Sequence, residues 1–106
     1  MSIFTFDGSG RISSSTNAIS IYVGGLPFDS SGNLVVSDNT IAPSHYTNGW
    51  PFDASGAVAI DNGGTISTYS NGLPISAVGR LVTDNTNAVT SWVNGLPAAT
   101  GGLSVA

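Results

Sequence analysis

Lysine, glutamate, glutamine and cysteine are absent from this chain of 106 residues, and charged residues make up only 8% of it, against about 25% in an average soluble domain. Without cysteine the chain has no disulfide and no thiolate metal site. Its only cations are Arg11 and Arg80, and the net charge of −4 disfavours binding to a phosphate backbone. No apolar run approaches the roughly 20 residues that span a bilayer. We therefore expect neither a nucleic-acid partner nor a membrane partner.

The chain contains one sequence motif that is repeated along its whole length. Pro27, Pro51, Pro74 and Pro97 are separated by 24, 23 and 23 residues, and a fixed period of this size is the signature of a repeat architecture. The same spacings separate the aromatic residues Tyr22, Tyr46, Tyr69 and Trp92 and the glycines Gly32, Gly56, Gly79 and Gly102. We divide the single domain 1–106 into a partial repeat 1–16 and full repeats at about 17–38, 39–61, 62–84 and 85–106.

Each repeat is predicted to contribute two short strands to an all-β fold. The first strand follows the repeat glycine, at residues 34–36, 58–60 and 81–82, where aliphatic residues stand between Gly and Asp-Asn. The second ends at the aromatic ring, at residues 19–23, 66–69 and 89–92, with Ser or Thr two residues before the ring. This period of two predicts one face of rings and hydroxyls and an opposite face of aliphatic side chains. Helices are not expected, because patterns with a helical period are absent and Gly and Pro recur along the chain.

A pair of residues that favours a tight turn occurs in each full repeat. Asn48-Gly49, Asn71-Gly72 and Asn94-Gly95 tolerate the positive φ that tight hairpins require, and Gly24-Gly25 serves the first full copy. Proline follows one residue later and forces the residue before it into an extended conformation. The residues so oriented are Leu26, Trp50, Leu73 and Leu96. We interpret them as core or interface plugs, with an exposed binding role as the alternative.

The four aromatic positions leave two interpretations open. Rings buried between strands or between chains indicate a structural role, whereas an exposed row of rings beside Asn and Asp indicates sugar recognition, which combines stacking with amide hydrogen bonds. The structural and interface candidates are Tyr22, Tyr46, Tyr69, Trp92, Leu26, Trp50, Leu73, Leu96, Pro27, Pro51, Pro74 and Pro97.

The chain offers few groups for acid–base catalysis. His45 occupies a repeat position that is filled elsewhere by Ile21, Thr68 and Ser91, so we interpret it as a tolerated strand residue. No G-x-S-x-G sequence is present. We therefore expect a protein that is not an enzyme and has no catalytic residues and no cofactor.

The aspartates are interpreted as turn formers. Asp7, Asp29 and Asp53 lie near Ser and Gly, but the spacing of a calcium loop and its closing Glu are missing, so no metal site is expected. The pairs Asp38-Asn39, Asp61-Asn62 and Asp84-Asn85 stand where the chain reverses after the first strand, and short Asx side chains close such turns.

The repeated motif resembles short repeats in virion proteins of tailed bacteriophages, including tail fibres and small capsid-decorating proteins. The resemblance rests on an "NGLP" turn followed by "SGxLVV", and the first copy departs from it with Gly for Asn. The copies are Gly24-Gly25-Leu26-Pro27, Asn48-Gly49-Trp50-Pro51, Asn71-Gly72-Leu73-Pro74 and Asn94-Gly95-Leu96-Pro97. It implies a structural virion component, commonly homotrimeric, with no catalytic residues.

From the resemblance we expect a capsid decoration or cement protein that stabilises the outer surface of the shell. The expected partners are further copies of the chain in a homotrimer, since a small domain with exposed strand edges is marginal alone, and the major capsid protein or another virion protein. The repeat continues to Ala106 without the distinctive tip of a receptor-binding fibre. A short tail or neck fibre and a glycan-binding β-repeat module are the alternatives.

Overall fold

A computed structural model describes residues 3–39 and 41–106, which form thirteen strands and no helix. The predicted all-β fold is confirmed. Met1 and Ser2 of the partial repeat, and Thr40 of the second full repeat, lie outside the described residues. Within the described ranges, no helix has the length and hydropathy needed to cross a membrane.

Each full repeat forms an antiparallel meander of three strands, so the prediction of two strands was wrong. An outer strand carries the aromatic ring, a middle strand carries the proline, and an inner strand follows the repeat glycine. The four meanders, called units 1 to 4, are β2 (Ile21–Val23), β3 (Leu26–Phe28) and β4 (Leu34–Asp38); β5 (His45–Thr47), β6 (Trp50–Phe52) and β7 (Val58–Asn62); β8 (Thr68–Ser70), β9 (Leu73–Ile75) and β10 (Leu81–Asp84); and β11 (Ser91–Val93), β12 (Leu96–Ala99) and β13 (Gly102–Ser104). The partial repeat, called the N-terminal unit, contributes the inner strand β1 (Ser14–Ser15).

The proline of each middle strand explains why that strand escaped prediction. Proline usually argues against a strand because it cannot donate to the ladder. Pro27, however, lies opposite Tyr22, one pair beyond the two-residue turn. At that pair the N–H of an ordinary residue points away from its hairpin partner, so the hairpin loses no hydrogen bond. The matching pairs are Tyr46 with Pro51, Tyr69 with Pro74 and Trp92 with Pro97.

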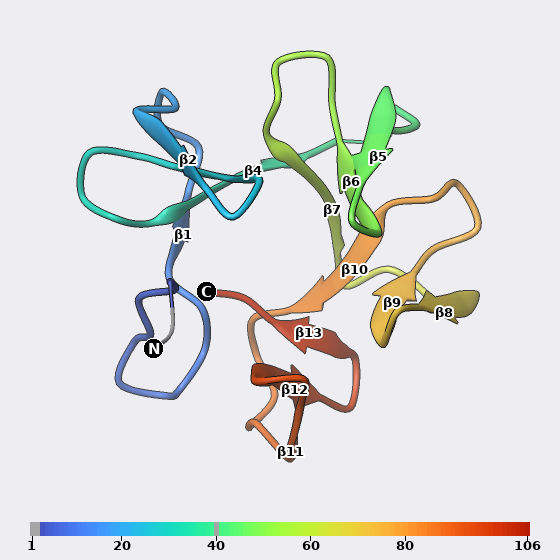
Figure 1. The fold of residues 1–106 in the computed structure, drawn as a ribbon. Coiled ribbons are helices and arrows are strands. Elements are labelled where there is room, and N and C mark those ends of the chain that lie inside the picture. The colour runs from blue at the N-terminus through green and yellow to red at the C-terminus, as the bar shows by residue number, and fades with distance from the viewer. Residues whose placement is uncertain (1–2, 40) are drawn as a thin grey trace.

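The five inner strands lie side by side and run parallel, in the order β1, β4, β7, β10 and β13. Figure 1 shows them around a common centre with the hairpins outside them. Parallel neighbours need a crossover of a dozen or more residues, which is usually a helix. Here residues 39–57 connect β4 to β7, and a β-hairpin takes the place of the helix because Gly and Pro are so frequent.

The curled sheet is joined across its two ends by the first and last units. Ile12 and Val105 form a parallel bridge, in which the Ile12 N–H donates to the Ser104 carbonyl over 2.9 Å and the Ala106 N–H donates to the Ile12 carbonyl over 2.7 Å. Together with the four parallel pairings this bridge makes a ring of five inner strands.

Each pairing in the ring is staggered by two residues. Leu34 lies beside Ser14, and Val58 lies beside Val36. The same stagger places Leu81 beside Ile60 and Leu103 beside Thr83. Because a sheet closes only when strands tilt and shift in register, the shared two-residue stagger is what allows five such short strands to meet.

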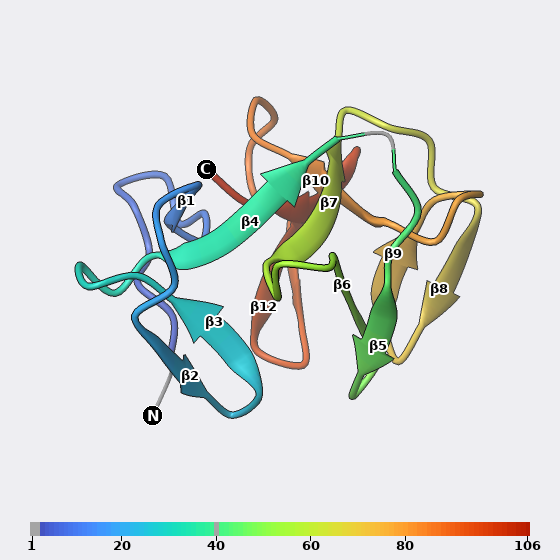
Figure 2. The same ribbon diagram turned by 90° about the horizontal axis from the view of Figure 1, so that it is seen from above.

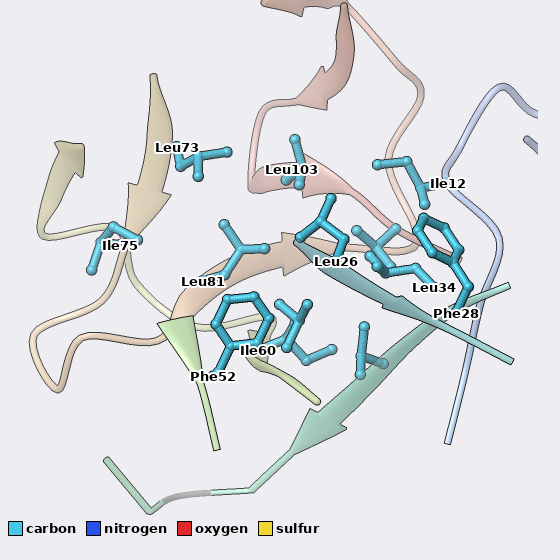
Figure 3. Packing of buried hydrophobic residues seen from close by; sticks show 13 residues of the cluster. Ile12, Leu26, Phe28, Leu34, Phe52, Ile60, Leu73, Ile75, Leu81 and Leu103 are labelled. Carbon is cyan, nitrogen blue, oxygen red and sulfur yellow. The ribbon is translucent and has the colours of Figure 1, made fainter. Parts of the chain in front are cut away.

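The core fills the space within this ring and beneath the middle strands. Equivalent positions of all five units, Ile12, Leu34, Val58, Leu81 and Leu103, are at most 3% exposed. Val36, Ile60 and Val105 lie two residues further along, and Phe28, Phe52 and Ile75 reach the same cluster from the middle strands. Figure 3 shows these side chains converging from different units. Burial of each Leu or Ile contributes about 1.5–3 kcal/mol, so each unit supports the others.

The two arginines connect the turns before β10 and β1 to loops between other units. Arg80, 1% exposed, donates through Nη1 to the Ile41 carbonyl over 2.6 Å and through Nη2 to the Ser37 and Ile60 carbonyls. Arg11 donates through Nη2 to the Asn87 carbonyl over 2.8 Å. An isolated buried charge is costly, and carbonyl dipoles offset that cost for Arg80.

Candidate functional site

The outer strands β2, β5, β8 and β11 form the periphery, and all of their residues are exposed. Both faces of β2 are open to solvent, since Ile21 is 56% and Tyr22 is 53% exposed, so neither the ring nor the aliphatic side chain is buried. The reason is position: the outer strand pairs with the middle strand of its own hairpin and lies outside the core. Tyr46, Tyr69 and Trp92 are likewise exposed by more than half.

These rings nevertheless span the boundaries between units. Tyr22 donates its hydroxyl to the Gly56 carbonyl over 3.3 Å, and Tyr46 donates to the Gly79 carbonyl over 2.8 Å. Each acceptor lies in the tight turn that precedes the inner strand of the next unit. Gly56 and Gly79 have φ of 89° and 92°, and a Cβ at either position would overlap the tyrosine hydroxyl. Glycine is therefore required there for both its φ and its lack of a side chain.

At the other two boundaries between units, the aromatic ring makes different contacts. Trp92 packs edge-on against Phe6 with 5.6 Å between ring centroids, which joins unit 4 to the N-terminal unit. Tyr69 borders a cavity of about 140 Å³ that Gly102 and Leu103 also line. The four aromatic positions thus lie at the boundaries of successive units, half-exposed rather than buried.

The aspartates that precede the repeat glycines close tight turns. Oδ1 of Asp29 accepts the N–H groups of Ser31 and Asn33, each over 2.9 Å. Asp7 and Asp53 make the same pair of bonds in their units. In the part of the chain that the structure describes, no three His, Asp, Glu or Cys residues are placed to hold a metal.

Two aspartate carboxylates, those of Asp29 and Asp84, accept hydrogen bonds strong enough to keep them charged in acid. The Ser15 hydroxyl, and after it the backbone N–H of Asn33, stabilises the carboxylate and holds the pKa of Asp29 well below its ordinary value of 3.8. The backbone N–H groups of Asn87 and then Thr86 lower the pKa of Asp84 in the same way. Asp84 also accepts the Gly101 N–H over 3.1 Å, so it connects the loop after β10 to the turn before β13.

The other predicted Asx turns form in part. Asn39 rather than Asp38 closes the first of them, because its Oδ1 accepts the Ile41 N–H over 2.9 Å. Asp38 instead accepts the Asn62 N–H of the next unit over 3.5 Å. His45 is exposed and stacks on Phe52, with 5.4 Å between ring centroids and 11° between planes.

The hairpin tips of the units surround a hollow, which we call the axial cup. Figure 2 shows the hairpins projecting from the inner strands towards one end of the molecule. The axial cup has a volume of about 270 Å³ and is lined by residues of all five units. Its lining residues are Phe4, Leu26, Trp50, Leu73 and Leu96, with Asn48, Asn71 and Asn94.

Four of the five apolar residues that line the axial cup are those that proline was predicted to orient, and Phe4 is the fifth. Leu26 and Leu73 are 6% and 3% exposed and belong to the core cluster, while Trp50 and Leu96 pack against it. Phe4 lies beside Trp50, with 6.3 Å between ring centroids and 33° between planes. Pro27, Pro51, Pro74 and Pro97 are buried behind them.

The rim of the axial cup is made by the turn asparagines. Asn48, Asn71 and Asn94 have φ of 53°, 52° and 53°, which confirms the positive φ expected for these turns. Each amide lies over the turn glycine of the preceding unit, since a Cβ at Gly49 would be 2.7 Å from Asn71 Nδ2. The three amides therefore occupy equivalent positions beside the turns of neighbouring units.

Sequence reasoning did not find the axial cup or the roles of Phe4 and Arg80. The turn asparagines were interpreted only for their φ, and the cup requires the hairpin tips of different units to meet. Phe4 stands two residues before Phe6, as Leu26 stands before Phe28, so the alignment of the partial repeat contained that signal. Arg80 follows a repeat glycine in the copy where Ser76 replaces Asp, which was a second unused signal.

Comparison with known proteins finds no match to a family model, to a curated protein or to a solved structure.

We predict that Tyr46→Phe lowers the free energy of unfolding by about 0.5–1.5 kcal/mol, the usual net worth of a hydrogen bond, because it removes the donor to the Gly79 carbonyl. Tyr69→Phe is the matched control, since among the described residues the Tyr69 hydroxyl makes no hydrogen bond. Urea unfolding of both variants measures the difference. Equal stability of the two variants would show that the boundary hydrogen bond contributes nothing.

We predict that the stability contributed by Asp29 and Asp84 is lost on acidification below about pH 4. The folded chain holds the protons of Asp29 and Asp84 less tightly than the unfolded chain does, where the ordinary pKa is 3.8. The stability that these carboxylates contribute is therefore fully present above the pKa of Asp in the unfolded chain. It decreases as the pH falls towards their lower pKa in the folded chain.

Asp84→Asn tests this assignment, with the exposed Asp38→Asn as control. The Asp84 variant should be less stable than the parent at neutral pH. It should lose less further stability between about pH 5 and about pH 2, the range around the ordinary pKa of Asp. Urea midpoints measured against pH give both quantities. A slope in the Asp84 variant identical to that of the parent would contradict the role of this carboxylate.

Proposed function

We propose that this chain is a non-enzymatic structural protein of a tailed-phage virion, and that it decorates the outer surface of the capsid. In this proposal homotrimers bridge neighbouring capsid subunits and stabilise the shell by adding contacts. The observation that carries the proposal is the set of four exposed outer strands on a rigid ring, because such strands are surfaces for docking.

The outer strands have free edges and apolar side chains. Among the described residues, β2, β5, β8 and β11 each pair with one neighbour only. An unpaired edge accepts a strand from another chain. Ile21, Trp92 and Val93 are 56%, 54% and 42% exposed on these strands. The edges and side chains together support docking to further copies of the chain and to a shell protein.

The charged groups support a docking role over a catalytic one. Arg11 and Arg80 donate to loop carbonyls, and Asp29 and Asp84 accept backbone N–H groups at turns. His45 stacks on Phe52 at the surface. With these groups engaged in turns and loops, docking relies on apolar and main-chain contacts, which screening by salt weakens little.

A short tail or neck fibre is the second virion assignment, since exposed strands also suit contacts along a fibre. The two assignments differ in which part of the particle needs the protein. Shell attachment stabilises the head, whereas a fibre stabilises only an appendage.

We predict that particles made without the protein have heads that lack surface knobs and release their contents at a lower temperature than complete particles. Electron microscopy and a thermal release assay measure both effects. Adding back purified protein should restore heat resistance, and the restored attachment should persist at high salt. Intact and equally robust heads that have lost a tail or neck appendage would instead assign the protein to a fibre.

The mass of the purified protein checks the homotrimer separately. Light scattering should give three times the 10.6 kDa of one chain at micromolar concentration. A stable monomer under the same conditions would contradict the trimer, while the imaging experiment would still decide the location.

A further inference from the structure

The axial cup combines an apolar floor with a rim of neutral amides. The floor has an indole at Trp50 and a phenyl ring at Phe4, and the rim has the amides of Asn48, Asn71 and Asn94. None of the lining residues is charged. An apolar wall with a few polar groups in fixed positions is the usual form of a small-molecule site.

The size of the axial cup limits the ligand to about one ring. Its volume of about 270 Å³ lies just below the range of about 300–1,000 Å³ that holds drug-sized ligands. A larger hollow of about 510 Å³ lies between units 1 and 2, but its lining has no aromatic side chain and consists mainly of small residues such as Ala18, Ser37 and Ser55. The axial cup is therefore the hollow with the chemistry for recognition.

The rim limits the ligand to a neutral molecule with hydroxyl groups. Each asparagine amide both donates and accepts hydrogen bonds. A purely apolar ligand would cover these amides and leave them unpaired, which is unfavourable. A phosphate or carboxylate would bring a negative charge to a site whose lining has no cation, because Arg11 and Arg80 are bound to loop carbonyls.

The rim is also organised before a ligand arrives. The three asparagines share a φ of 52–53°, and each amide lies beside the turn glycine of the preceding unit. Little conformational entropy is then lost on binding. Unit 1 has Gly24 at the equivalent position, so the amides line the cup from units 2, 3 and 4 and the rim lacks an amide at unit 1.

We propose that the axial cup binds one neutral pyranose sugar ring, as the terminal residue of a glycan. An apolar face of the sugar lies against Trp50 and Phe4, and its hydroxyl groups exchange hydrogen bonds with Asn48, Asn71 and Asn94. This site is separate from the outer strands on which the virion proposal rests, and it can be tested on the purified chain alone.

The repeat provides a reporter for this test. Trp92→Tyr places at that position the residue that the other units carry at Tyr22, Tyr46 and Tyr69, and it leaves Trp50 as the only tryptophan. The probes are the methyl glycosides of D-glucose, D-galactose, D-mannose and N-acetyl-D-glucosamine. At least one should change the Trp50 emission with saturation, at a Kd of about 1 mM, the affinity expected for a ligand of this size.

Two further variants locate the binding site. Asn71→Gly introduces the residue that unit 1 has at Gly24, and Trp50→Leu introduces the residue of the other units, so both changes keep the hairpin. Each should weaken binding of the responding glycoside at least tenfold, measured by calorimetry. Asn85→Gly, in the exposed loop after β10, is the control and should leave the affinity unchanged.

Three results would overturn the proposal. The first is no saturable change with any of the four glycosides. The second is an equal response to sorbitol, an acyclic polyol, which would exclude recognition of a pyranose ring. The third is binding that Trp50→Leu and Asn71→Gly leave unchanged in folded protein, checked by circular dichroism, because the sugar would then bind outside the axial cup.

Discussion

The two-residue stagger between neighbouring inner strands is the constraint on which the rest of the structure depends. Five strands of two to five residues meet in a ring only because every pairing shifts by the same amount, and the bridge between Ile12 and Val105 completes it. The stagger also brings Ile12, Leu34, Val58, Leu81 and Leu103 into one buried group. Because the units are similar in sequence, their inner strands pair with the same stagger, and this shared stagger closes the ring.

Closure decides where the remaining features lie. Once the inner strands form a ring, each hairpin must project from it, so the hairpin tips of all units meet around the axial cup and the outer strands remain at the periphery. Neighbouring units are then near enough for Tyr46 to reach the turn at Gly79 and for Arg80 to reach the loop at Ile41. The proposed docking surface and the proposed sugar site thus occupy two different parts of one architecture, the outside of the hairpins and the space between their tips.

Local features of the sequence predicted much of this fold. Aliphatic runs marked the inner strands, and the Asn-Gly pairs marked turns in which Asn71 and its equivalents have positive φ. The middle strands escaped because Pro27 and its equivalents normally argue against a strand. The half-exposed rings, the axial cup and the partners of Arg80 could not be predicted, because they depend on which units become neighbours. The stagger that determines those neighbours arises from pairing between residues at least 20 positions apart, so no short segment of the sequence indicates it.

Ring closure can be tested most directly by amide hydrogen exchange at Ile12, read by NMR. The Ile12 N–H donates to Ser104, and the Leu34 N–H makes the matching bond to Ser13 over 3.0 Å at an interior pairing of the ring. If the first and last units complete the ring, Ile12 should exchange as slowly as Leu34, since both bonds open only when the core opens. Fast exchange at Ile12 together with slow exchange at Leu34 would show an open sheet and contradict this account.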